Sequence, residues 1–202
     1  MAAQPPEVVG PYAAADLPAG SVRDYVAELA HLGQAAFRRC GWLQRLRASG
    51  AVEPAPEVDM SGVHSRHYVA GAMAPLVLER FLAPLGSGRG LPEYHELVWA
   101  VYFGEYARNA ANTVHGGAIA AVCDYIGASL GNVTAWLRVD YRQGPPRTDD
   151  AVWKLSAWVS EVKQNGRRKK VEVELCDGET GKALCTAEGE FVDTSIPRPP
   201  RL

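Results

Sequence analysis

One short segment, His115 to Leu130, constrains this chain more than any other part of the sequence. It begins His-Gly-Gly and continues as AIAAVCDYIGASL, which is apolar around nearly the whole circumference of a helix. A helix of that kind has to be buried. Asp124 stands in its middle, and a carboxylate on a buried helix costs on the order of several kcal/mol unless it is paired or functional. The segment therefore predicts a central helix in which Asp124 has a specific task.

The start of this helix suits a ligand that approaches the backbone closely. Gly116 and Gly117 carry no side chain to keep a ligand away. The first N–H groups of a helix have no partner within it and lie at the positive end of its dipole. They can therefore bind an anion, or a carbonyl oxygen that is becoming one. Asp124 lies about 12 Å further along the axis, at ~1.5 Å per residue, so a second subunit would have to bring the two features together.

Each of these features also has a purely structural explanation. A Gly-Gly pair before a helix is typical of a tight turn, and a histidine at a helix start can serve as a cap. A buried aspartate is often simply hydrogen-bonded structure. The occurrence of all three on one short segment, with extended runs on both sides, favours a functional site.

The remaining sequence predicts a helical front end followed by strands around the central helix. Helical spacing covers residues 21–49 with a possible break at Gly41, and a turn-rich linker covers 50–66. The predicted strands are 76–82, 96–105, 133–142, 153–159, 171–175 and 183–192, and Asn165-Gly166 predicts a two-residue hairpin turn. We expect an α+β fold with a mostly antiparallel sheet. The domain limits are 1–66 for a tail, helical extension and linker, 67–193 for the main domain, and 194–202 for a loose tail.

Residues 133–142 alternate in a way that assigns their side chains to two faces of a strand. Thr134, Trp136 and Arg142 belong to one face, and Leu137 and Tyr141 to the other.

Composition excludes several classes of function. The net charge of −2 gives no indication of nucleic acid or of a membrane surface. The four cysteines share no CxxC spacing, which argues against a zinc site and against a disulfide framework. No apolar run reaches the ~18 residues of a membrane span, and the first 20 residues do not resemble a secretory signal. We expect an intracellular protein, in the cytoplasm or an organelle matrix, without a metal or a redox cofactor.

The helix segment resembles the signature of hotdog-fold thioesterases. His115-Gly116-Gly117, an aspartate nine residues after the histidine, and then Gly127 match that signature. The run Ala187-Glu188-Gly189-Glu190-Phe191-Val192 is similar to its closing strand. The group it resembles most is the phenylacetate-pathway and animal THEM-type acyl-CoA thioesterases. The resemblance extends over about residues 96–193 and covers the first 75 residues poorly.

This resemblance implies a curved antiparallel sheet wrapped around one long helix, preceded here by the helical extension. It implies a homodimer or a dimer of dimers whose active sites lie between subunits. Gly116 would donate its N–H to the thioester carbonyl, and Asp124 of the opposite subunit would act as general base or nucleophile. His115 would position water or the carbonyl, and Thr134 would orient the carboxylate or water.

Further residues are expected to contact the substrate, namely Gly117, Asn112, Arg142, Arg167 and Arg168. The basic run 167–170 follows the hairpin turn, where it can contact the phosphates of coenzyme A. The alternative is a solvated hairpin edge whose charges discourage aggregation. In alternation Arg168 and Lys170 point one way and Arg167 and Lys169 the other, so at most half of the run can touch one ligand.

The expected activity is hydrolysis of an acyl-CoA to a free acid and coenzyme A, within lipid metabolism. The principal alternative is a non-catalytic hotdog protein that acts as a structural or acyl-binding subunit of a larger assembly, since a fold does not settle a function. A hotdog dehydratase is a weaker alternative, because the sequence lacks a second site that pairs a catalytic histidine with an acid.

Overall fold

A computed structural model describes residues 22–54, 76–86, 88–104, 107, 111, 113–142 and 151–197. Most of the predicted linker, the first 21 residues, Asn112 and the last five residues lie outside these ranges. The predicted helical front end is confirmed as two helices, α1 (Val22–Arg39) and α2 (Gly41–Ala48). The break falls where expected, because Cys40 is in an extended conformation with φ −73° and ψ 111°.

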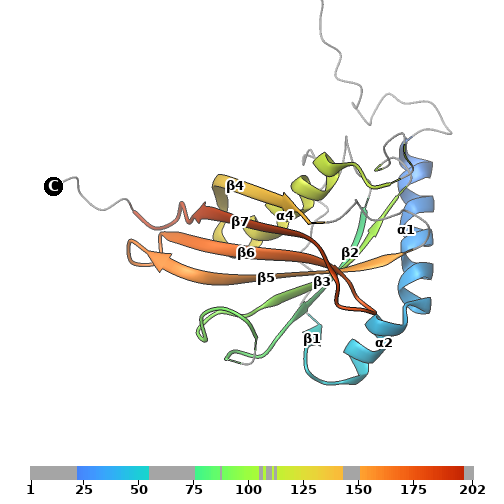
Figure 1. The fold of residues 1–202 in the computed structure, drawn as a ribbon, viewed down its shortest axis with the longest axis horizontal. Helices are drawn as coiled ribbons and strands as arrows, with labels where there is room; N and C mark the ends of the chain where they lie inside the picture. Colours follow the sequence, from blue (N-terminus) through green and yellow to red (C-terminus); the bar gives the residue numbers. More distant parts are fainter. Residues whose placement is uncertain are drawn as a thin grey trace, which may run out of the picture.

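Among the described residues the sheet contains seven strands in the order β1-β2-β3-β5-β6-β7-β4, and every neighbouring pair is antiparallel. Figure 1 shows this order from β4 at the top to β1 at the bottom. The bounds are β1 (Glu53–Pro54), β2 (Leu76–Leu82), β3 (Leu97–Phe103), β4 (Val133–Tyr141), β5 (Val152–Lys163), β6 (Arg168–Asp177) and β7 (Ala183–Val192). All the predicted strands are present. The two-residue strand β1, inside the expected linker, was not predicted.

The predicted hairpin turn joins β5 to β6. Asn165 and Gly166 have φ angles of 53° and 90°, and the Arg167 N–H donates to the Gln164 carbonyl at 3.1 Å. Two central residues with positive φ match the twist of a two-residue hairpin.

The central helix α4 (Gly116–Gly131) packs on one face of the sheet and contacts β4, β5, β6 and β7. Its buried residues, among them Ile119, Val122 and Ile126, join the inward-facing residues of the strands in the main core. This is the helix-on-curved-sheet arrangement of the hotdog fold that the sequence predicts. Because α4 is apolar on nearly all sides, only a sheet that curls around it removes enough of its surface from water.

The helices α1 and α2 cover part of the opposite face. Phe37, Trp42 and Leu43 pack there against the outward residues of β2 and β3, including Phe81 and Val98. The α2 helix is also tied to the turn after β6, since Glu179 accepts a hydrogen bond from the Trp42 N–H at 2.8 Å. The extension is therefore a second layer on the sheet. Within the described ranges, no helix is long and apolar enough to cross a membrane.

The register assigns each residue to a face. Trp99, Leu155, Leu175, Cys185 and Tyr141 form one row across β3, β5, β6, β7 and β4 on the side that α4 covers. The next row lies on the other side and consists of Val98, Ser156, Glu174, Thr186 and Asp140. We call these the helix face and the outer face.

Candidate active site

The side chain of His115 caps the first turn of α4. Its Nδ1 accepts a hydrogen bond from the Gly117 N–H at 3.0 Å, so in the neutral ring the proton is on Nε2. The His115 N–H donates to the Ala107 carbonyl at 2.6 Å, which fixes the approach to the helix. The cap that sequence reasoning left open is therefore present. It occupies the N–H of Gly117, one of the residues expected to contact substrate.

At this helix start, the Gly116 N–H differs from the N–H groups that follow it, because it has no acceptor among the described residues. The next N–H groups are bonded, since Gly117 donates to His115 Nδ1 and both Ala118 and Ile119 donate to the His115 carbonyl. Among the described residues, none accepts a hydrogen bond from the Gly116 N–H. A free N–H at the positive end of a buried helix can stabilise negative charge on a carbonyl oxygen.

Tyr141 is a neighbour of Gly116 whose role was not anticipated. Its hydroxyl donates to the Gly116 carbonyl at 2.6 Å, and a Cβ on Gly116 would lie 3.3 Å from that hydroxyl. Burial raises the pKa of Tyr141, so the phenol remains a proton donor. The alternation of β4 already assigned Tyr141 to the apolar face, and that was the available signal. Tyr141 thus ties the end of β4 to the start of α4.

Asp124 is paired within its own subunit. The Thr134 hydroxyl donates to Asp124 Oδ1 at 2.6 Å, which joins the middle of α4 to the start of β4. Asp124 is only partly buried in the single chain. Its other oxygen, Oδ2, has no hydrogen-bond partner among the described residues. The carboxylate is therefore held by one oxygen and open at the other.

A β-bulge in β4 makes this pair possible. Thr134 opposes Phe191 of β7, but Trp136 opposes Glu190, so Ala135 is the extra residue. Phe191 lies in the core against α4, and its partner Thr134 faces the same way. The prediction that Thr134 shares a face with Trp136 and Arg142 is wrong, because the bulge reverses the alternation at Ala135.

The neighbouring thiol of Cys123 is not available for chemistry. A hydrogen bond with Cys185 and complete burial raise the pKa of the Cys123 thiol, and a protonated thiol is a poor nucleophile. Cys123, Cys176 and Cys185 are buried free cysteines, as expected for small core residues. Among the described residues, no group of three His, Cys, Asp or Glu side chains could hold a metal ion.

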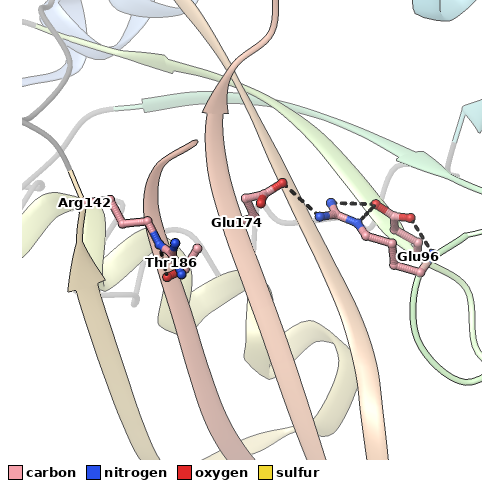
Figure 2. Close-up of polar contacts among 5 residues, drawn as sticks. Glu96, Arg142, Glu174 and Thr186 are labelled. Carbon is pink, nitrogen blue, oxygen red and sulfur yellow. Dashed lines mark hydrogen bonds and ion pairs between the residues drawn. The ribbon is translucent and has the colours of Figure 1, made fainter. Parts of the chain in front are cut away.

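Arg142 lies just beyond β4 on the outer face, away from the Asp124–Thr134 pair. Its Nε donates to Thr186 Oγ1 at 3.3 Å, as Figure 2 shows, and its N–H donates to the Leu184 carbonyl at 3.0 Å. Its two terminal nitrogens have no partner among the described residues. Arg142 can therefore still contact an anion at the surface.

The side chains of the basic run already have partners within the subunit. Arg167 is 8% exposed and donates to the carbonyls of Asp193 and Ile196. Arg168 pairs with Glu190, and Lys170 pairs with Glu188 at 2.7 Å. Lys169 donates to the Leu130 carbonyl, at the C-terminal end of α4, at 3.2 Å. The predicted division of the run between two faces is confirmed for residues 168–170.

The position of β6 and the existing partners of the run bear on both explanations. Because β6 lies between β5 and β7, the run begins an interior strand of the sheet next to the β5–β6 hairpin turn. The expected phosphate contacts of Arg167 and Arg168 would have to compete with bonds that these side chains already make.

Comparison with known proteins gives structural neighbours only. No protein-family model matches the chain, and no curated protein matches it by sequence. A hypothetical thioesterase protein from Streptococcus pneumoniae, solved with coenzyme A, is 20% identical, with a TM-score of 0.43 over 52% of this chain and 84% of that one. Zebra fish thioesterase superfamily member 2 is 19% identical, with a TM-score of 0.45 over 57% and 80% of the two chains. The Escherichia coli PaaI protein from the phenylacetic acid degradation operon is 15% identical, with a TM-score of 0.43 over 48% and 76%.

Proposed function

We propose that this chain is an acyl-CoA thioesterase, in which Asp124 activates water and the Gly116 N–H of a second subunit polarises the thioester carbonyl. The observation that carries the proposal is the Asp124–Thr134 pair on a buried, glycine-opened helix. A carboxylate with one oxygen bonded and the other open is suited to accept a proton from water.

The reaction needs only these groups. The Gly116 N–H binds the carbonyl oxygen, and Thr134 holds Oδ1 of Asp124 so that Oδ2 faces the water. Asp124 takes a proton from the water as the water oxygen attacks the carbonyl carbon. The negative charge then develops on the carbonyl oxygen that the Gly116 N–H binds. The C–S bond then breaks, and the leaving sulfur takes the proton to give a thiol and a carboxylic acid.

The assembly in the proposal is a homodimer joined through β4. Along the helix axis Gly116 and Asp124 are about 12 Å apart, at ~1.5 Å per residue. One subunit therefore cannot place both on one thioester carbonyl. Among the described strands β4 pairs only with β7, and its exposed side chains include Val133, Trp136 and Tyr141. An apolar, unpaired edge strand favours pairing with a second copy, and a two-fold axis would place each Gly116 in the site of the other subunit.

The proposed substrate contact outside the reaction centre is Arg142, whose terminal nitrogens have no partner among the described residues and suit a phosphate of coenzyme A. In the non-catalytic alternative, the N-terminal helical extension would dock to a partner protein of the larger assembly. It has less support now, because α1 and α2 are already packed on the outer face of their own sheet.

Mixing two inactive variants tests the reaction and the assembly together. Asp124→Asn keeps the shape of the side chain and removes the base, so turnover should fall about 10²- to 10⁴-fold. Gly116→Pro removes the N–H at a helix position where proline is favoured, and His115 already has the extended backbone that precedes proline. Its turnover should fall about 10²- to 10³-fold.

If the sites are shared, a mixed dimer contains one site with both an intact Gly116 and an intact Asp124. Denaturing and refolding the two variants together should then restore about one quarter of wild-type thiol release, because half of the dimers are mixed and each has one intact site. Each variant refolded alone is the matched control. Restoration no greater than the sum of the two controls overturns the shared site, and full activity of Asp124→Asn overturns the catalytic assignment. A wild-type protein that releases no thiol from any acyl-CoA would support the non-catalytic alternative.

A further inference from the structure

The two edges of the sheet differ in how well they are protected against pairing with another strand. At one edge β1 is only two residues long and ends in Pro54, which has no N–H to donate. At the other edge β4 is nine residues long and contains neither proline nor lysine (Figure 1). Short edge strands, prolines and lysines are the usual features that prevent edge-to-edge association. Among the described residues β4 pairs only with β7, so its other side is the edge that a partner strand can join.

The backbone of β4 shows which of its residues would bond a partner strand. The Arg142 N–H donates to the Leu184 carbonyl of β7 at 3.0 Å. Alternate residues of an antiparallel strand bond the same neighbour, so the even-numbered residues of 136–142 bond β7 and the odd-numbered ones direct their N–H and C=O groups to the open edge. The bulge at Ala135 ends this pattern. We call 136–142 the regular stretch.

The outer face of the regular stretch carries two exposed charges of opposite sign. The side chains of Arg138 and Asp140 are 65% and 52% exposed, and Arg138 Nε lies 3.2 Å from Asp140 Oδ2 within the chain. With Val139 on a two-fold axis, Arg138 of each copy opposes Asp140 of the other. The ion pair within each chain is kept, and unlike charges alternate among the four side chains. These positions are the ones that do not bond the partner's backbone, where opposed side chains come closest.

The remaining side chains of the regular stretch also match in this register. On the helix face Leu137 opposes Tyr141, and the two Val139 side chains meet. On the outer face Trp136 opposes Arg142, and a guanidinium can stack on an indole while its N–H groups stay at the edge of the plane, open to a phosphate. The exposed rings of Trp136 and Tyr141 are thereby covered.

Other positions for the axis are less favourable. Opposed residues share a face, so the axis passes through a residue and not between two. An axis at residue 138 or 140 sets two Arg138 or two Asp140 side chains against each other, and like charges directly opposite are destabilising. An axis at residue 137 brings the bulge at Ala135 into the pairing, and an axis at residue 141 leaves most of the regular stretch unpaired.

We propose that two copies of this chain pair their β4 strands over the regular stretch, antiparallel, with Val139 on the two-fold axis. This inference rests on the proposed function, because it specifies the partner that completes the active site. The Tyr141 hydroxyl bonds the Gly116 carbonyl, and the Thr134 hydroxyl bonds Asp124. Within one chain Tyr141 and Thr134 are seven positions apart, but Tyr141 of one copy opposes a position of the other that is three from Thr134. The register therefore brings the start of α4 in one copy towards Asp124 of the other.

Complementary charge variants test the register without any measurement of turnover. Arg138→Asp alone sets aspartates against aspartates across the axis, and Asp140→Arg alone sets arginines against arginines. Each should raise the dimer Kd at least about tenfold, measured by analytical ultracentrifugation of the full chain. An equimolar mixture of the two variants should form a heterodimer with about the wild-type Kd, because every opposed pair again has unlike signs. The ion pair within the chain is lost in both variants, so it cannot cause the recovery.

An ion pair on β5 is the matched control for these variants. Lys163 and Glu161 are exposed and two residues apart, 3.0 Å from each other, on a strand that β6 and β7 separate from β4. Lys163→Asp and Glu161→Arg should leave the dimer Kd unchanged.

Disulfide cross-linking locates the axis directly. A cysteine on the axis lies about 5.5 Å from its own copy between Cα atoms, within the range of a disulfide. One position away, that distance is about 8 Å, which is too long. Oxidation with copper–phenanthroline should therefore give a covalent dimer for Val139→Cys but not for Arg138→Cys or Asp140→Cys on a non-reducing gel. Wild type, treated in the same way, controls for the four native cysteines.

The possible outcomes separate this inference from the proposed function. A protein that stays monomeric at every concentration overturns the register and the shared active site together. A dimer whose charge variants do not recover on mixing, or that cross-links at position 138 or 140 in place of 139, overturns the register alone. The expected pairing in a protein that releases no thiol from any acyl-CoA would refute the hydrolase and leave the interface standing.

Discussion

On the helix face of the sheet, Asp124 and the indoles of Trp99 and Trp153 have atoms without a hydrogen-bond partner among the described residues, whereas on the outer face several charged side chains form ion pairs across strands. Asp124 has one bonded oxygen, and the indole N–H groups of Trp99 and Trp153 have no acceptor among the described residues. On the outer face Arg168 pairs with Glu190, and Lys170 with Glu188. The comparison gives a hypothesis to test, namely that an atom without a hydrogen-bond partner marks a functional group better than its charge does.

Arg89 is the fullest example of the outer-face pattern. Its guanidinium donates to Glu96 and to Glu174, both labelled in Figure 2, at 2.9 Å each. It also stacks on Trp158, with the guanidinium carbon 3.8 Å from the ring centroid. Burial alone would raise the pKa of Glu96, but the hydrogen bonds and charge of Arg89 outweigh it and hold that pKa below its ordinary value of 4.5. An arginine with these bonds holds the loop before β3 against the sheet, and few of its N–H groups remain to bind a ligand.

The largest effect is expected where α4 meets the sheet. A Cβ on Gly127 would lie 2.3 Å from Cζ of Phe191, a ring that is fully buried. Alanine favours a helix over glycine by about 1 kcal/mol, but overpacking typically costs about 1–3 kcal/mol and sometimes more. Because the Phe191 ring has no free space, Gly127→Ala should lower the free energy of unfolding by about 2 kcal/mol or more, measured by urea denaturation.

Gly41→Ala, at the start of α2, is the matched control for this clash. A Cβ there would lie 3.0 Å from Oε1 of Glu179, an exposed and flexible carboxylate, so the change should stay below about 1 kcal/mol. Phe191→Leu should lower the free energy of unfolding less in the Gly127→Ala background than in the wild type, because the smaller side chain relieves the contact with the new Cβ. If Phe191→Leu lowers the free energy of unfolding equally in both backgrounds, the Phe191 ring is not what excludes a side chain at position 127.

The Asp124–Thr134 bond is the next test, and it concerns turnover rather than stability. Removing a hydrogen bond to a charged group costs about 1.5–3 kcal/mol, so Thr134→Ala should lower kcat about 10- to 100-fold. KM should change little, since Thr134 acts through Asp124. Thr134→Ser retains the hydroxyl and should recover most of kcat, whereas Thr134→Val keeps only the shape. A kcat that falls as far in Thr134→Ser as in Thr134→Ala contradicts a positioning role for the hydroxyl.

Much of the fold could be predicted because it depends on local pattern. The apolar circumference of α4, the alternation of the strands and the Asn165-Gly166 turn are all readable from neighbouring residues. The pairing of β1 with β2 was missed, because two residues carry no periodicity. The bulge at Ala135 was missed for a different reason. It is set by how β4 registers with β7, and the sequence of β4 alone reads as unbroken alternation.

The site was predicted in part for the same physical reason. Asp124, Gly116 and His115 share one helix, so their order along the chain already relates them in space. The partners of Arg167 and Arg168 come from residues at least 22 positions away in the chain. No pattern in the neighbouring sequence predicts such distant partners. Without them, a basic run after a turn is readily interpreted as a ligand contact. Tyr141 had its face predicted correctly, but its bond to the Gly116 carbonyl depends on the curl of the sheet around α4.

The smallest effect is expected for the paired arginine that sequence analysis assigned to coenzyme A. Arg168→Ala removes an ion pair with Glu190, and partly exposed pairs contribute about 0–1 kcal/mol. Its KM for an acyl-CoA should therefore change less than about twofold. The terminal nitrogens of Arg142 have no partner among the described residues, so Arg142→Ala should raise KM about five- to tenfold. That increase should diminish at high salt because the contact is exposed. Steady-state kinetics at low and high salt compare the two variants directly. If Arg168→Ala raises KM as much as Arg142→Ala does, the ligand breaks the ion pair between Arg168 and Glu190. Positive charge, and not an unpaired hydrogen-bond donor, would then identify the residues that bind coenzyme A.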